Sequence, residues 1–209
     1  LSEYPESRVG CETLTTTNRV VMAGEVRGPQ SITHADLEQL ARDAVKDIGY
    51  EQDGFHWKNA EVQVYVHSQS VDIAQGVDAA GNKDEGAGDQ GIMFGYACNE
   101  TDELMPAPVM FAHRILRKMA EIRKAGEQAK WLRPDCKSQV ALKYEDGQMV
   151  GIENVVVSTQ HAADADNDTI RNFIISEIIK PSLPAELIND STQYLINPTG
   201  RFVIGGPQG

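Results

Sequence analysis

Apolar and polar residues alternate along several short stretches of this chain, and a period of two is typical of β-strands that bury one face. Residues 9–26 contain two such stretches, and residues 62–67 (VQVYVH) form a third. Residues 92–97 (IMFGYA) are an apolar run of strand length. Residues 137–159 read as two further strands around Asp146-Gly147, a pair that favours a two-residue hairpin turn.

Apolar residues recur every three or four positions in other stretches, which predicts amphipathic helices. The first helix is expected between Thr33, a good N-cap residue, and Gly49, which can end a helix in the left-handed conformation. A second is expected to follow Pro106 and Pro108, because proline is tolerated in the first turn of a helix.

A third helix is expected to start from a cap at Asn167 or Asp168 and to run through Ile179. Pro181 is expected to stop it, since proline lacks the N–H group that a helix interior uses. Strands, helices and a hairpin therefore occur in both halves of the chain. This pattern predicts an α+β fold in which helices pack on one face of each sheet.

Composition narrows the functional class. The 209 residues carry a net charge of −12, which argues against nucleic acid as a partner because its phosphates are bound mainly by Lys and Arg. No apolar run approaches the ~20 residues of a membrane span. The three cysteines lack CxxC spacing, so we expect reduced thiols and a cytoplasmic location. The HExxH, GxSxG and GxxxxGK[ST] motifs are all absent from the sequence. This argues against the commonest classes of zinc enzyme, hydrolase and phosphate-loop protein.

The glycine-rich stretch at residues 76–91 stands apart from these elements. Its five glycines lie among small and charged residues that cannot bury enough surface to hold one conformation, so a mobile loop is expected. Asp89 and Gln90 place a carboxylate and an amide near its end, which suits a small polar ligand. The alternative is a surface turn whose aspartate caps the next element.

The string GAGDQGIMFGYA at residues 86–97 closely resembles the hallmark of methionine adenosyltransferase, also called S-adenosylmethionine synthetase. Six other segments resemble the family and occur in its order: GCET (10–13), MAGE (22–25), DIAQGV (72–77), WLRPDCKSQV (131–140), STQH (158–161) and NPTGRFVIGGP (197–207). The resemblance implies two similar sheet-plus-helix domains. We expect residues 1–84 to be the rest of an N-terminal region that ends in a mobile active-site loop, and residues 85–209 to be the central domain.

The family's His-Pro-Asp-Lys segment and its later Gly-Arg-Lys and Gly-Lys-Asp segments do not occur in this sequence. We therefore expect an internal piece of a longer enzyme, with the catalytic histidine outside the five histidines present. The resemblance implies that methionine sulfur attacks the ribose C5′ of ATP and displaces triphosphate, which is later hydrolysed. It also implies Mg²⁺ and K⁺ as cofactors and a homodimer or homotetramer with active sites at the dimer interface.

Matching strings assign an ATP-binding set. Lys137 is the expected catalytic cation at the departing triphosphate, and Asp135 the acceptor for the ribose hydroxyls, with Cys136 between them. Arg201 and Phe202 are expected at the adenine, where an aromatic ring can stack on the base. The alternatives are an exposed strand lysine for Lys137, a turn residue for Asp135 and a core residue for Phe202.

Glu25, Gln75 and Asp89 resemble the methionine-binding set, and Asp89 is also assigned a catalytic role. Two carboxylates would pair with the substrate ammonium, and Gln75 would donate to its carboxylate. Glu12 resembles a potassium-associated glutamate, although a strand glutamate facing water is the alternative. Two functional hypotheses follow. The chain is either part of an active methionine adenosyltransferase, or an inactive piece of it that retains folding and association surfaces.

Overall fold

The computed structural model describes residues 4–29, 31–70 and 91–209. These residues form a mixture of helices and sheets, which confirms the α+β class. The chain divides into two compact units, residues 1–95 and 96–207. The domain boundary predicted between residues 84 and 85, and most of the loop predicted at 76–91, lie outside the described residues.

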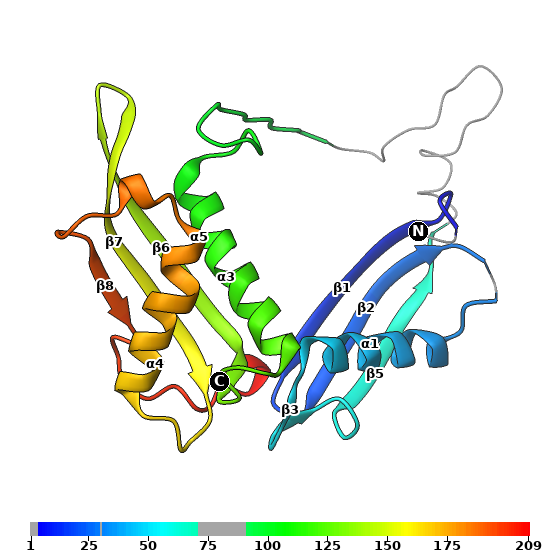
Figure 1. The fold of residues 1–209 in the computed structure, drawn as a ribbon. Helices are drawn as coiled ribbons and strands as arrows, with labels where there is room; N and C mark the ends of the chain where they lie inside the picture. The colour runs from blue at the N-terminus through cyan, green and yellow to red at the C-terminus, as the bar shows by residue number, and fades with distance from the viewer. Residues whose placement is uncertain (1–3, 30, 71–90) are drawn as a thin grey trace. The chain divides into compact units, whose positions relative to one another are not determined.

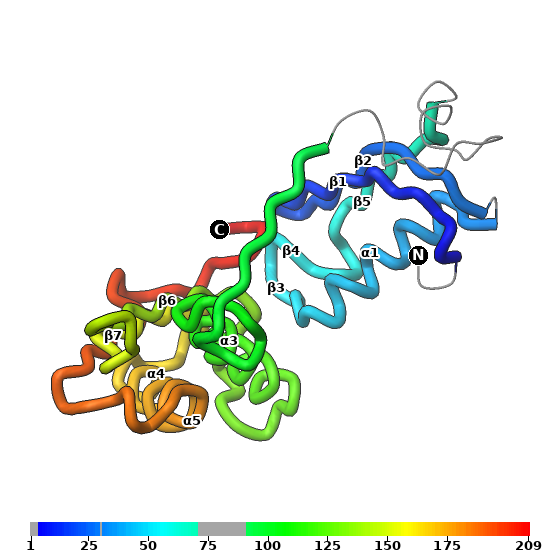
Figure 2. The backbone as a smooth tube through the Cα atoms, turned by 90° about the horizontal axis from the view of Figure 1, so that it is seen from above, coloured from blue at the N-terminus to red at the C-terminus, as the bar shows by residue number. Residues whose placement is uncertain are grey.

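The first unit contains a three-stranded sheet in the order β1-β2-β5 (Figure 1). Strand β1 (Arg8–Thr16) pairs antiparallel with β2 (Arg19–Arg27), and β5 (Glu61–Ser68) pairs parallel with β2. Helix α1 (His34–Ile48) connects β2 to β5 and covers one face of the sheet (Figures 1 and 2). A small hairpin of β3 (Glu51–Gln52) and β4 (Phe55–His56) follows the helix.

Local chemistry explains the bounds of α1 and a feature of β2. The Thr33 side chain accepts from the Asp36 N–H, and the Asp36 carboxylate accepts from the Thr33 N–H, which forms a capping box. Gly49 ends the helix at φ 94°, so both predicted ends are confirmed. Within β2, Gly24 has φ 142°, and an added Cβ would lie 2.0 Å from the backbone oxygen of Gly10. Only glycine fits between these two strands.

The second unit has a sheet in the order β6-β7-β8. Strand β6 (Leu132–Glu145) pairs antiparallel with β7 (Gln148–His161), and β8 (Gln193–Ile196) pairs parallel with β7. The predicted hairpin turn is confirmed, because Asp146 and Gly147 both have positive φ, 48° and 78°. Helix α3 (Ala107–Ala125) begins just after Pro106, also as predicted.

The third predicted helix is present, but its ends differ from the prediction. Asp166 caps it, since its carboxylate accepts from the Thr169 N–H. Its segments are α4 (Asn167–Phe173), the π-helix η1 (Ile174–Ile179) and α5 (Lys180–Ser182). Helix continues past Pro181 because the proline falls in the first turn of α5, directly after the π turn in which the Lys180 N–H bonds to the Ile175 carbonyl. Two short 3₁₀ turns follow: η2 (Ala185–Leu187) and η3 (Gly206–Gln208).

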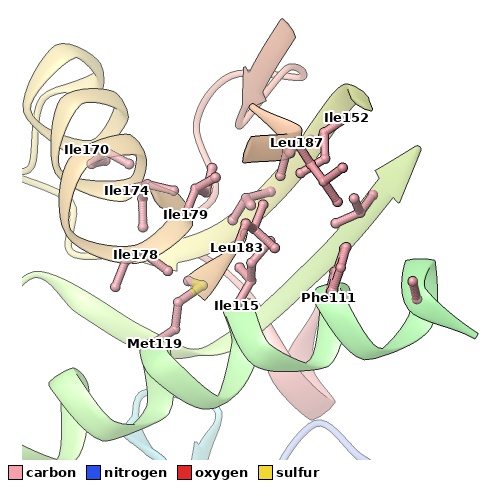
Figure 3. Packing of buried hydrophobic residues seen from close by; sticks show 14 of the residues in the cluster. Phe111, Ile115, Met119, Ile152, Ile170, Ile174, Ile178, Ile179, Leu183 and Leu187 are labelled. Atoms are coloured by element: carbon pink, nitrogen blue, oxygen red, sulfur yellow. The ribbon is translucent and has the colours of Figure 1, made fainter. Parts of the chain in front are cut away.

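The core of the second unit lies between its helices and one face of its sheet (Figure 3). Ile178 and Ile179 are both fully buried, which the wider π turn permits by directing two successive side chains inward. The other buried residues lie along α3, the strands, α4, the start of η1 and the segment after α5: Ala107, Phe111, Ile115, Met119, Leu132, Val140, Ile152, Val155, Val157, Ile170, Ile174, Leu183 and Leu187. The opposite face of the sheet is therefore open to carry polar side chains.

The strand predicted at residues 92–97 is wrong. This stretch has no regular secondary structure, and Phe94 is 93% exposed. A strand requires a hydrogen-bonded partner, and the described residues include no strand paired with it. Gly95 also interrupts the apolar run and weakens any intrinsic preference for a strand.

Among the residues that the structure describes, none of the helices has the length and apolar character needed to span a bilayer. The three cysteines, Cys11, Cys98 and Cys136, are all described and all free, as the sequence predicts.

Candidate functional site

Strand β6 separates the predicted nucleotide residues onto two faces. Cys136 is opposite the buried Thr159 in the β6–β7 ladder and packs against the hydrophobic core. Because successive side chains of a strand point to opposite faces, Asp135 and Lys137 lie on the face without helices. Lys137 is paired there with Ser158. Cys136 can therefore reach a ligand on that face only through its backbone.

A segment after β8 brings an aromatic ring to these polar side chains. The Lys137 Nζ lies 5.7 Å from the centroid of the Phe202 ring, which is within the range of a cation–π contact. The Asp135 Oδ2 accepts from the Gly206 N–H at 2.8 Å. A Cβ added to Gly205 would approach side-chain atoms of Phe202, Asp135 and Gln160 to within 3.0 Å. The structure thus brings Asp135, Lys137 and Phe202 together, while Arg201 is exposed beside them.

Side-chain hydrogen bonds, together with backbone bonds from Asn197 to Val157 and from His161 to Phe202, hold this segment to the end of β7. The Asn197 side chain accepts from the Thr159 N–H at 2.8 Å and donates to the Thr159 carbonyl at 3.1 Å. The Gln160 Nε2 donates to the Val203 carbonyl at 2.9 Å. Because the Asn197 bonds are buried and the Gln160 bond is partly buried, each stabilises one position of the segment more than it would in water.

In the first unit, two predicted acidic residues share the open face of the sheet. The ladder pairs Glu12 with Ala23 and Gly10 with Glu25, so both carboxylates project to the side away from the buried Val20. Gln69 donates from Nε2 to the Glu25 Oε1 at 3.3 Å. The Gln69 Oε1 is buried and has no hydrogen-bond partner within the described part of the chain.

Two family profiles match this chain. The one described as "S-adenosylmethionine synthetase, central domain" matches residues 84–202, and the one described as "S-adenosylmethionine synthetase, N-terminal domain" matches residues 1–71. The chain belongs to the S-adenosylmethionine synthetase family. The resemblance inferred from the motifs is confirmed.

Curated relatives support the same family assignment. An S-adenosylmethionine synthase of Parvibaculum lavamentivorans is 60% identical over 209 residues, which are 100% of this chain and 53% of the relative. One of Methylobacterium sp. (strain 4-46) is 60% identical over 212 residues, with 54% of the relative covered. S-adenosylmethionine synthase 2 of Rhodospirillum rubrum is 59% identical, with 53% covered. The chain spans about half the length of these family members.

The remaining predicted site residues fall on both sides of the limit of the described structure. Gln75 and Asp89 lie outside the described residues. Gln69, which sequence reasoning missed, is the amide that contacts Glu25. Gln69 directly follows β5, and Glu25 lies on the neighbouring strand β2. The sequence could have indicated this contact only if the parallel pairing of β2 with β5 had been known.

The described residues of this chain do not by themselves fit a metal centre. No group of three or more His, Cys, Asp or Glu side chains stands close enough to hold an ion in residues 4–29, 31–70 and 91–209. Glu12 supplies one carboxylate, whereas Mg²⁺ and K⁺ in proteins are surrounded by several oxygen ligands.

Cys136 offers a test of its placement. Burial raises the pKa of its thiol, and the nearby Asp135 carboxylate adds to this effect. Since the thiolate is the reactive form, we expect Cys136 to react with iodoacetamide more slowly in the folded chain than in urea between pH 7.5 and 9. Peptide mapping by mass spectrometry measures both rates, and equal rates would place the thiol on the open face.

Proposed function

We propose that this chain is part of a methionine adenosyltransferase (EC 2.5.1.6), which forms S-adenosylmethionine from ATP and L-methionine in one-carbon metabolism. The observation that supports this most directly is the convergence of Asp135, Lys137 and Phe202 on one open sheet face in a member of the synthetase family. A cation, a hydroxyl acceptor and an aromatic ring together match the triphosphate, ribose and base of ATP.

The proposed reaction is a single displacement. A lone pair on methionine sulfur forms the S–C5′ bond while the C5′–O bond breaks, and its electron pair leaves with the triphosphate. The sulfur becomes a sulfonium cation, and water later hydrolyses the triphosphate. Because negative charge grows on the leaving oxygen, a preorganised cation such as the Lys137 ammonium lowers the barrier more than acid–base chemistry would.

The same segment supplies the other nucleotide contacts that we propose. Phe202 would stack on adenine, with Arg201 at the edge of the base. Asp135 would accept from the ribose hydroxyls, with its orientation fixed by the Gly206 N–H. Cys136 would contribute through its backbone, because its thiol packs in the core.

For methionine, Glu25 would pair with the substrate ammonium, and the buried Gln69 Oε1 would be a second acceptor. Gln75 and Asp89 remain proposed members of this site, Asp89 with its catalytic role. We expect Glu25→Gln to raise the KM for methionine about tenfold or more, because hydrogen bonds to charged groups contribute about 1.5–3 kcal/mol. The KM for ATP should change little.

Steady-state kinetics with each substrate varied in turn measures the two constants. Glu61→Gln is the matched control. Glu61 is an exposed carboxylate at the start of β5, the end of that strand away from Glu25, and it pairs with Arg19 at 2.6 Å. Equal increases in both KM values for the Glu25 variant would contradict the placement of the methionine pocket.

Several wider features belong to the same proposal. Two similar domains, 1–84 and 85–209, are supported by the shared order of hairpin, helix and parallel strand in the two units. We also propose Mg²⁺ and K⁺ as cofactors, with Glu12 near K⁺, and a cytoplasmic homodimer or homotetramer with active sites at the dimer interface. The three free cysteines support the reducing compartment.

The half-length match to the relatives supports a second proposal: a catalytically inactive piece that retains folding and association surfaces. The two are distinguished by incubating the protein with ATP, L-methionine, Mg²⁺ and K⁺ and measuring S-adenosylmethionine and phosphate, beside an intact-mass spectrum of the same sample. Turnover supports the transferase. ATP binding without turnover, from a chain of 22.9 kDa, supports the inactive piece.

A further inference from the structure

Buried polar side chains are concentrated at one place in the described structure. Five are buried among the described residues, and four of them lie where β7 ends and the next segment crosses it: Thr159, Gln160, His161 and Asn197. Burying a polar group without a partner costs about 1–3 kcal/mol, so such a cluster is stable only when its hydrogen bonds are made. His161 is 2% exposed and is the cluster's titratable member.

The hydrogen bonds of His161 fix the form of its ring. The Phe202 N–H donates to the His161 Nε2 at 3.0 Å, so Nε2 carries no proton. The Nδ1 lies 2.9 Å from the Ala162 carbonyl oxygen, which can only accept, so Nδ1 carries the proton. The imidazole is therefore the neutral Nδ1–H form, with its one acceptor directed at Phe202.

The backbone of His161 also bonds to Phe202. Its N–H donates to the Phe202 carbonyl oxygen at 2.9 Å. Phe202 has no regular secondary structure around it, so these two bonds and the neighbouring Gln160–Val203 bond set the position of its backbone. The ring of Phe202 then stands over the Lys137 Nζ as a consequence.

We infer that His161 is a positioning residue for nucleotide binding, which acts by fixing the backbone of Phe202 so that its ring stands ready to stack on adenine. This inference rests on the proposed function and adds a residue that does not itself touch the nucleotide. An apolar side chain at position 161 would fill the space but would remove the acceptor of the partly buried Phe202 N–H. The effect should fall on recognition of the base and spare recognition of the triphosphate.

Two variants separate the acceptor from the volume. His161→Phe keeps a flat ring and removes the acceptor, whereas His161→Gln keeps a carbonyl oxygen that can accept from Phe202. The probes are adenosine 5′-(β,γ-imido)triphosphate and inorganic triphosphate, measured by calorimetry in the same magnesium-containing buffer. For His161→Phe we expect about tenfold weaker binding of the adenine-containing probe and unchanged binding of triphosphate, since base stacking on an aromatic ring contributes about 1–3 kcal/mol. His161→Gln should restore most of the loss.

A double-mutant cycle with Phe202→Leu tests whether His161 acts through Phe202. The effects should not add, because once the ring is gone its positioning no longer matters. If His161→Phe does not fold, His161→Asn takes its place, since its amide can keep the bond to the Ala162 carbonyl while removing the acceptor for Phe202. Equal losses for both probes, or full additivity in the cycle, would overturn the inference. A wild-type chain that binds neither probe would instead overturn the proposed function on which it rests.

Discussion

Replacing Lys137 with methionine is expected to lower the rate of S-adenosylmethionine formation about 10²-fold or more, the usual cost of removing a principal electrostatic stabiliser. The side chain lies on the open face of β6, beside Phe202 and two residues after Asp135 in the sequence. Methionine retains the length and apolar stem of lysine, so the loss isolates the charge. The effect should appear in kcat, because the charge that Lys137 stabilises is larger in the transition state than in bound ATP.

Lys143→Met is the matched control for this experiment. Lys143 lies on the same strand, is exposed, and pairs with Glu145 at 2.7 Å near the hairpin turn. Its loss should leave the rate nearly unchanged, since exposed ion pairs contribute little. An unaltered kcat for Lys137→Met, or an equal fall for both variants, would contradict the proposed role.

Gly24→Ala is expected to destabilise the first unit by about 3 kcal/mol or more, from backbone strain and overpacking combined. At φ 142° a side chain is strained whatever the space, and the new Cβ would lie 2.0 Å from the Gly10 oxygen and 3.0 Å from the Cys11 Cα. These are backbone atoms of the paired strand, which can move only by separating β1 from β2. The adjacent Glu25 would shift with them.

Urea unfolding followed by tryptophan fluorescence measures this change. The two tryptophans lie in different units, so a Trp131→Phe background leaves Trp57 to report on the first unit alone. Gly10→Ala is the control, because its Cβ would meet only ordinary contacts, the nearest 3.6 Å away at Glu25. Similar unfolding curves for the two alanine variants would show that β1 and β2 tolerate more separation than the structure indicates.

Local signals in the sequence predicted the elements that local chemistry determines. Thr33 and Gly49 bound a helix because capping involves neighbouring residues, and Asp146-Gly147 turns because its backbone preferences are intrinsic. The run at residues 92–97 failed as a strand because pairing depends on a partner that no local pattern specifies. The cap at Asp166 was misplaced by one or two residues, since three successive residues could each cap and only the backbone path selects one.

The residues of the candidate site also divide into those that local sequence predicted and those that it did not. Asp135, Lys137 and Phe202 were found from their motif, and the structure brings them together across 71 residues of sequence between Asp135 and Gly206. Gln69 and His161 were missed because polar residues near a strand end look like surface positions. Their roles depend on burial and on a partner distant in sequence, which the alternation of apolar and polar residues does not reveal.

The alternating faces of β6 link folding to chemistry. A slip of one residue against β7 would turn Lys137 into the core and bring Cys136 out onto the open face, because every side chain of a strand changes sides together. Burying an unpaired ammonium is costly, so the lysine itself penalises the wrong alignment. Correct folding and correct placement of Lys137 beside Phe202 therefore depend on the same β6–β7 register. A chain that folds with this register also has its lysine in place.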